Sequence, residues 1–231
     1  GIEQKYKSIK NKDIPLPNFS EAIPQEPYSS VFTLPGKIEM EDYDLGGQGI
    51  AYYDKDVENQ GEAYRNDGVD IVTVDSISDA KGYAIGYTQE GEWTEYSIAV
   101  EKTAPYFYKA NVASGLDFSS FIIMVDGKQV ADTVKIPQTD SWNTYTTVDG
   151  KTSEIKAGDH ILRVRISGAY VNIDWIAFAE TKEELEDLTG NIDILSGEPK
   201  EATVVDMMGK TWARVVAKSS VDATMKIKEK R

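Results

Sequence analysis

The strongest constraint on the fold is a series of short β-type runs between residues 38 and 178. Clusters of Gly, Asp and Asn separate these runs at a spacing typical of strands and turns. Leu162, Val164 and Ile166 alternate with polar residues, a period of two that buries one face of a strand. We predict strands at Val69–Val74, Trp93–Val100, Tyr106–Ala113, Phe121–Val125, Trp142–Val148, Ile161–Ile166 and Val171–Phe178.

Many short strands without a long amphipathic helix predict an all-β fold, a jelly-roll β-sandwich of two antiparallel sheets. We place this domain at residues 37–180. Residues 1–36 contain five prolines without helical or strand periodicity, which predicts a Pro-rich linker. The chain does not begin with a signal-peptide pattern, so we expect an upstream segment to have been removed.

The C-terminal region differs from the sandwich in pattern and charge. Thr181-Lys182-Glu183-Glu184 is a capping-box pattern and predicts a short helix linker over residues 181–190. Residues 191–231 carry a small excess of basic residues, whereas the rest of the chain is strongly acidic. Runs around Val204 and Trp212 predict a hairpin, so we treat 191–231 as a small basic C-terminal β appendage.

Composition excludes several functions. The 39 acidic residues outnumber the 25 basic ones, a balance that disfavours nucleic acid as a partner. The longest apolar runs are too short for a transmembrane helix. There is no cysteine, which excludes disulfides and thiolate chemistry, and the single histidine, His160, is interpreted as structural. Enzyme motifs such as Gly-x-Ser-x-Gly and His-Glu-x-x-His do not occur.

Two residue patterns indicate binding chemistry. Glu39 and Glu41 flank one residue at the start of a predicted strand, and such carboxylate pairs suit Ca²⁺ once a third acid joins them. The chain also has 13 Tyr and 4 Trp, several near turns. Flat aromatic rings at loop edges can stack on sugar rings, although packing is an equal alternative for each one.

Six separated motifs follow one another in the order and spacing of a known family. They are Ile38–Asp44, Gly82–Tyr87, Gly91–Tyr96, Pro137–Tyr145, Ala157–His160 and Asn172–Ile176. Through them, residues 38–178 resemble the family 6 carbohydrate-binding modules. The resemblance implies a calcium-bearing β-sandwich that binds polysaccharide and has no catalytic role.

The resemblance also implies two sugar-binding clefts. In the first, at a loop edge of the sandwich, a Tyr and a Trp clamp a sugar ring and an Asn binds its hydroxyls. Those positions fall on Tyr87, Trp142 and Asn172. A long loop between residues 51 and 71 is expected to add further contacts at the same edge. Its candidate residues are Asp54, Tyr64 and Arg65.

The second cleft of the family lies on the concave face of a sheet. Trp93 and Arg165 match its aromatic and basic positions, but Met124 stands where a carboxylate is expected, which weakens this cleft. The structural Ca²⁺ of the family is expected on three acids of this chain, Glu39, Glu41 and Asp174.

The resulting hypothesis is a monomeric, secreted or cell-surface bacterial module. It targets a covalently linked polysaccharide-degrading enzyme upstream to plant cell-wall xylan or another β-glycan. Two alternatives stay open, a protein-docking β-sandwich without sugar binding and a fragment of a catalytic glycosidase. Residues 191–231 weakly resemble a bacterial type IX secretion sorting domain, and a basic adhesion tail is an equal interpretation of their last six residues.

Overall fold

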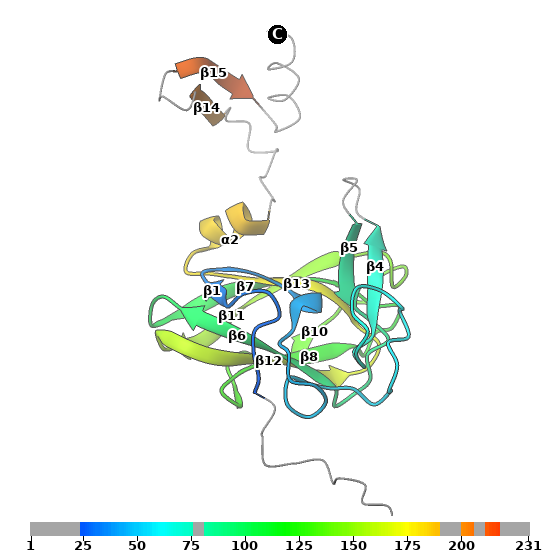
Figure 1. Cartoon of the computed structure of the whole chain (residues 1–231). Coiled ribbons are helices and arrows are strands. Elements are labelled where there is room, and N and C mark those ends of the chain that lie inside the picture. Colours follow the sequence, from blue (N-terminus) through cyan, green and yellow to red (C-terminus); the bar gives the residue numbers. More distant parts are fainter. Residues whose placement is uncertain (1–23, 76–80, 190–199, 206–210, 218–231) are drawn as a thin grey trace, which may run out of the picture. The chain divides into compact units, whose positions relative to one another are not determined.

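The computed structural model describes residues 24–75, 81–189, 200–205 and 211–217 (Figure 1). By internal contacts the chain divides into two units, 1–185 and 186–231. The first unit contains two sheets, and the second contains a separate antiparallel hairpin of β14 (Lys200–Val205) and β15 (Thr211–Ala217). The all-β prediction and the C-terminal hairpin are therefore confirmed. Residues 1–23 and 218–231 lie outside the described residues.

The first sheet has the strand order β1-β6-β12-β8-β10, with β3 added beside β6 and β9 beside β8. Its strands are β1 (Phe32–Leu34), β3 (Tyr52–Tyr53), β6 (Trp93–Val100), β8 (Ser120–Val125), β9 (Lys128–Gln129), β10 (Val134–Lys135) and β12 (Gly158–Gly168). All pairs are antiparallel except β1 with β6, which run parallel.

The second sheet has the order β11-β7-β13-β5-β4, with β2 paired to β13. Its strands are β2 (Gly36–Glu39), β4 (Ile71–Asp75), β5 (Lys81–Ile85), β7 (Ala104–Ala113), β11 (Thr146–Ile155) and β13 (Asn172–Ala179). Every pair in this sheet is antiparallel. One continuous core joins the two sheets, with Tyr96, Phe121 and Leu162 from the first and Tyr106 and Phe178 from the second.

The linker prediction for residues 1–36 is wrong at its C-terminal end. Phe32–Leu34 forms β1 and pairs with β6, and Leu34 is fully buried in the core. The prolines on either side interrupt the alternation that would have revealed a three-residue strand. The sandwich therefore includes at least part of the segment that we had placed in the linker.

The predicted strand Trp142–Val148 is also shifted. Residues 141–145 form a turn, in which the Thr144 amide donates to the Ser141 carbonyl at 3.1 Å, and the strand runs from Thr146 to Ile155. The hydroxyl of Thr139 donates to the same carbonyl at 2.8 Å. Hydroxyl side chains of this kind compete with strand pairing, and here they leave Trp142 in a loop.

The helix prediction is confirmed as α2 (Lys182–Thr189). Its N-terminus is capped by the Thr181 hydroxyl, which accepts from the Glu184 amide at 3.2 Å, and the Glu184 carboxylate accepts from the Glu180 amide at 3.0 Å. Leu185 packs on Ala177 and Ala179 of β13. Among the residues described, no helix has the length and apolarity needed to cross a membrane.

Candidate functional site

Loops from both sheets meet at one edge of the sandwich. The β5–β6 loop and the β12–β13 loop are joined by Thr88, whose carbonyl accepts from the Tyr170 amide at 2.7 Å. The Thr88 hydroxyl donates to the Val171 carbonyl and accepts from the Val171 amide, each at 2.9 Å. Thr88 is buried, so this connection fixes the two loops relative to each other without depending on water.

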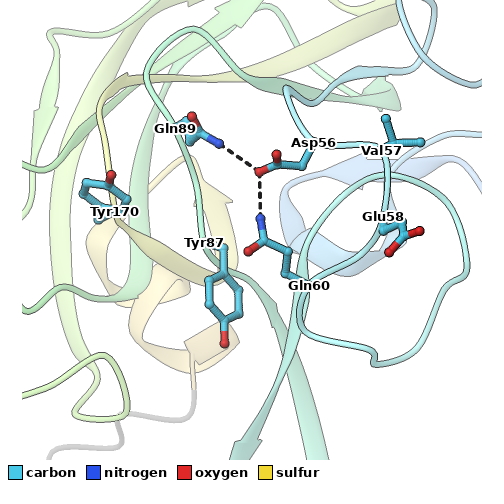
Figure 2. Close-up of a pocket in the computed structure, with 7 residues that line it drawn as sticks. All are labelled: Asp56, Val57, Glu58, Gln60, Tyr87, Gln89 and Tyr170. Carbon is cyan, nitrogen blue, oxygen red and sulfur yellow. Dashed lines mark hydrogen bonds between the residues drawn. The ribbon is translucent and has the colours of Figure 1, made fainter.

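A cleft of about 610 Å³ opens at this edge (Figure 2). In Figure 2, Tyr170 stands on one side and the loop that carries Val57 and Glu58 on the other, with Tyr87 between them. The residues that line the cleft are Asp56, Val57, Glu58, Gln60, Tyr87, Gln89 and Tyr170. Two tyrosine rings and several polar groups therefore face one open space, an arrangement suited to a polyhydroxylated ligand.

Both tyrosines have an unusual backbone. The φ angles are +48° at Tyr87 and +64° at Tyr170, a left-handed conformation that non-glycine residues rarely adopt. About half of each side chain is exposed, 51% for Tyr87 and 47% for Tyr170. Such conformations persist only where surrounding contacts enforce them, and they cluster at binding sites. Here the bonds of Thr88 supply those contacts.

Asp56 organises the polar side of the cleft. Its Oδ2 accepts from Gln60 Nε2 at 2.7 Å and from Gln89 Nε2 at 2.9 Å, the two dashed lines in Figure 2. Its backbone amide donates to Asp54 Oδ1 at 2.8 Å. Because one carboxylate receives both amide nitrogens, the orientation of both glutamine side chains is set by Asp56.

The three residues predicted to form the loop-edge cleft lie near one another, but only Tyr87 lines the cleft. Trp142 is 44% exposed and is not a lining residue, but its Nε1 donates to the carbonyl of Tyr170 at 3.3 Å. Asn172 is buried, and its Nδ2 donates to the Trp142 carbonyl at 3.0 Å. Trp142 is thus held beside the cleft by Asn172 and next to Tyr170.

The long loop contributes to the cleft through different residues from those predicted. Arg65 is only 6% exposed, with its guanidinium 3.6 Å from the ring centre of Tyr43, and it pairs with Asp67 at 2.8 Å. Tyr64 is exposed, but it stacks on Tyr83 at 4.7 Å and donates a hydrogen bond to Asp42. Neither Arg65 nor Tyr64 lines the cleft, because aromatic and acidic neighbours hold both elsewhere.

Asp54 lies behind the cleft, not in its lining. It is buried, and burial together with the nearby Glu92, Asp70 and Asp56 carboxylates raises its pKa to about 7. The residues that sequence reasoning missed are Tyr170 and those of the turn around Asp56. A turn-forming run at Ser167–Tyr170 was visible in the sequence, but turn residues are common and do not by themselves indicate a ligand.

The residues predicted for the second cleft lie on the outer face of the first sheet. Trp93 of β6 is opposite Arg165 of β12, and Arg163 is opposite both Glu95 and Met124. Arg163 lies 3.9 Å from the Trp93 ring centre and forms an ion pair with Glu95 at 2.6 Å. One face of Trp93 is therefore already covered by a protein cation, while the Arg165 side chain is exposed.

The three predicted calcium ligands come together where β2 meets β13. Glu39 ends β2 and Glu41 lies in the 3-10 turn Met40–Asp42, so this pair follows a strand, and the prediction that it begins one is wrong. Asp174 belongs to β13. One carboxylate oxygen from each lies within 4.8 Å of the others. The pairing of β13 with β7 is irregular between Ile173 and Trp175, so Asp174 lies at a bulge, and Trp175 packs outside the main core.

The surroundings of this acidic group disfavour its charged form. Burial, with smaller contributions from Glu39, Asp42 and Asp174, raises the pKa of Glu41 to about 8. Burial also raises the pKa of Asp174 to about 6, although Asn111 Nδ2 donates to it at 2.8 Å. Glu41 Oε2 is buried without a hydrogen-bond partner. Three hard oxygen donors around an unsatisfied buried atom fit Ca²⁺.

A second group of carboxylates, Asp54, Asp56 and Asp70, also lies within 4.8 Å. It differs from the first group because none of its carboxylate oxygens is buried without a hydrogen-bond partner, whereas Glu41 Oε2 of the first group is. Asp70 Oδ1 accepts from the backbone amide of Gln60 at 2.6 Å. Asp54 and Asp56 accept the hydrogen bonds described above. These bonds satisfy the carboxylates within the protein.

The chain matches a known protein family. The family model described as carbohydrate binding module (family 6) matches residues 60–180. No curated protein matches. One similar solved structure is the family 6 module of Cellvibrio mixtus lichenase 5A in complex with cellotriose, at 21% identity over 64% of this chain and 98% of that chain, with a TM-score of 0.49.

Two further structures show comparable similarity. A family 6 module from Clostridium stercorarium, in complex with cellobiose, is 24% identical over 66% of this chain and 99% of its own, with a TM-score of 0.49. A β-1,3-glucan-binding module from Bacillus halodurans is 20% identical over 65% and 99%, with a TM-score of 0.49. The family match covers more than half of the chain and includes Tyr87 and Tyr170 of the cleft, and on that basis the chain belongs to the family 6 carbohydrate-binding modules, which are non-catalytic.

Proposed function

We propose that this chain binds polysaccharide at the loop-edge cleft, with the rings of Tyr87 and Tyr170 stacking on sugar and the side chains around Asp56 bonding its hydroxyls. The observation that carries the proposal is the pair of half-exposed tyrosines, both with positive φ, beside a 610 Å³ cleft. An exposed aromatic ring interacts weakly with water and gains free energy when it stacks on the apolar face of a pyranose. A rigid pair of rings also loses little entropy on binding.

Trp142 extends this aromatic surface beyond Tyr170. Its indole nitrogen bonds the Tyr170 carbonyl, and its ring lies so close to Gly115 that a Cβ there would be 2.8 Å from the indole. The glycine leaves room for the ring in its observed position. Trp142 would therefore contact the next sugar along a chain, in keeping with the role expected from the family resemblance.

The ligand that we propose is a β-linked plant cell-wall glycan, with xylan as the first candidate. We expect an affinity between roughly micromolar and millimolar, because a few stacking and polar contacts must offset the ordering of ligand and side chains. In this proposal the module is a secreted or cell-surface monomer. It brings a linked catalytic domain to the polysaccharide and carries out no chemical step itself.

A structural Ca²⁺ belongs to the same proposal. Glu39, Glu41 and Asp174 would hold it, and the ion would neutralise carboxylates that otherwise repel one another. The acidic group adjoins the pairing of β2 with β13, so the ion would stabilise the sandwich and not contact sugar. We also propose that the Trp93 face contributes little to binding, because Arg163 already covers the Trp93 ring.

Affinity electrophoresis against xylan, cellulose derivatives and β-glucans tests the function. Wild-type protein should be retarded by at least one neutral glycan. Trp142→Ala should lose most of that retardation while its thermal unfolding midpoint stays unchanged. Trp93→Ala, which removes one indole from the outer face of the first sheet, is the matched control and should be retarded like the wild type. Reducing sugar should not be released in the same samples.

Two results would contradict the proposal. If no glycan retards the wild-type protein, a protein-docking role takes its place. If Trp93→Ala abolishes retardation while Trp142→Ala does not, the sugar binds at the sheet face and not at the loop edge.

A further inference from the structure

The side of the cleft around Asp56 presents hydrogen-bond acceptors. Gln60 Nε2 donates to Asp56 Oδ2 at 2.7 Å and to Asp70 Oδ2 at 3.3 Å, so both of its amide hydrogens are directed to carboxylates. Gln89 Nε2 donates to the same Asp56 oxygen at 2.9 Å. Within the described part of the chain, nothing donates a hydrogen bond to Gln60 Oε1 or Gln89 Oε1.

The orientation of the amides follows from the charge of Asp56. A carboxylate can only accept, so each glutamine must turn its nitrogen toward Asp56 and its oxygen away from it. In Figure 2 the oxygens of Gln60 and Gln89 point away from the shared carboxylate. An uncharged amide at position 56 could donate as well as accept, and the two glutamines could then flip.

The negative charge of the cleft also favours ligands that donate hydrogen bonds over ligands that carry negative charge. Asp56 and Glu58 are both lining residues, and among the residues that the structure describes no Lys, Arg or His lines the cleft. The nearest cation in sequence is Lys55, whose amide donates to Glu92 Oε1 at 3.1 Å and whose charge acts on the Glu92 carboxylate. A ligand in this cleft thus meets negative charge from the β3–β4 loop and amide oxygens from the β3–β4 and β5–β6 loops.

We infer that the cleft selects neutral sugar chains against chains with acidic substituents, and that Asp56 is the positioning residue for this selectivity. The inference rests on the proposed function and names its substrate class. Sugar hydroxyls donate hydrogen bonds to amide and carboxylate oxygens, whereas uronate or sulfate groups only accept and carry like charge. A xylan backbone without glucuronate would bind, and its glucuronate-substituted stretches would be avoided.

Titration calorimetry with matched oligosaccharide pairs tests the inference. The probes are xylohexaose, cellohexaose and laminarihexaose, each beside an oligosaccharide of the same backbone that carries one uronic acid. We expect the wild-type protein to bind its preferred neutral probe at least tenfold more tightly than the acidic partner at low salt. Because surface repulsion is screened, the ratio should narrow in 0.5 M NaCl.

Asp56→Asn is the decisive variant, and Glu62→Gln is its control, because Glu62 is an exposed acid of the same loop that does not line the cleft. Asp56→Asn should reduce the neutral-to-acidic ratio to about threefold or less, while Glu62→Gln should leave it unchanged. A purely structural role of Asp56 would weaken both ligands by one factor and keep the ratio, and that result would overturn the inference.

Other outcomes also decide the matter. Equal binding of neutral and acidic probes by the wild type would overturn the selectivity and leave the proposed function intact. A gain in affinity in CaCl₂ over EDTA for acidic probes but not for neutral ones would show that a cation at Asp54, Asp56 and Asp70 reverses the charge, which also overturns it. If no neutral probe binds, the proposed function fails and the inference fails with it.

Discussion

Two regions of this molecule gather carboxylates, and they differ in what their oxygens contact. At the loop edge, Asp56 receives two amide nitrogens from Gln60 and Gln89. Where β2 meets β13, Glu41 has a buried oxygen without a partner, beside two further acids. The same residue type therefore occurs in two settings: a carboxylate with protein donors can present acceptors to a ligand, whereas a buried one without them is unfavourable while charged and can be neutralised by a proton or a cation.

Calcium removal tests this comparison with the largest expected effect. At a calcium concentration about a thousandfold above Kd, binding to the Glu41 group would stabilise the fold by about 4 kcal/mol. EDTA should then lower the unfolding midpoint by roughly 10 °C in scanning calorimetry. Glu41→Gln should remove the response to calcium, and Asp56→Asn should keep it. Identical midpoints in CaCl₂ and EDTA would show that the acidic group holds no structural ion.

The pH dependence of stability in EDTA tests the Glu41 group next. Folding raises the pKa of Glu41 to about 8, so between its ordinary value of 4.5 and about 8 the folded state binds more protons than the unfolded state. Stability from this group is therefore highest below about pH 4.5 and falls as pH rises toward 8, by a few kcal/mol at most.

Urea denaturation of wild type and Glu41→Gln at pH 5, 6.5 and 8 measures this effect. The wild type should lose stability relative to the variant as pH increases, and added CaCl₂ should reverse that trend because calcium binds the deprotonated acids. A wild type that gains stability relative to the variant between pH 5 and 8 without calcium would contradict the assignment.

The loop edge should respond to Tyr87→Ala with a smaller free-energy change. We expect affinity for the preferred neutral glycan to fall about tenfold, or about 1.4 kcal/mol, because one stacking ring is lost. Tyr87 is half exposed, so the unfolding midpoint should stay within about 2 °C. Calorimetric titration and thermal unfolding of the same samples measure both quantities. A large loss of stability would place Tyr87 in packing and not in binding.

Gly115→Ala should have the smallest effect on glycan affinity. It tests whether the aromatic surface that contacts sugar extends to Trp142. A methyl group at position 115 would lie 2.8 Å from the Trp142 ring, so the exposed ring must move. If Trp142 contacts the ligand, affinity should fall about threefold with little change in stability. Full affinity in this variant would restrict the sugar to Tyr87 and Tyr170. Tryptophan fluorescence provides an independent report that the ring has moved.

The sequence predicted most strands, because a strand with one buried face leaves a local period of two. β6 was predicted at its observed bounds, Trp93–Val100. The errors arose where a local signal was weak or interrupted. Phe32–Leu34 is too short, between its flanking prolines, to show a period of two. Trp142 was predicted in a strand, but the Thr139 hydroxyl bonds the Ser141 carbonyl and the residue lies in a turn.

Candidate site residues divide in the same way. Glu39, Glu41 and Asp174 come together as predicted, because two of them are close in sequence and strand pairing with β2 brings the third near. Arg65 was predicted at the cleft because of its position in the long loop, but its guanidinium packs on Tyr43. No local sequence pattern predicts such a long-range contact. Tyr170 and Asp56 acquire their positions only through bonds to other loops.

The sequence by itself therefore determined the β-sandwich, the acidic charge and the types of residue available for binding sugar and calcium, since these depend on periodicity and composition. Tertiary structure alone decided which side chains line the cleft, how the amides of Gln60 and Gln89 are turned, and which carboxylate lacks a partner. The physical reason is that burial and hydrogen-bond partnership are properties of residues distant in sequence, and they exist only after the two sheets have packed.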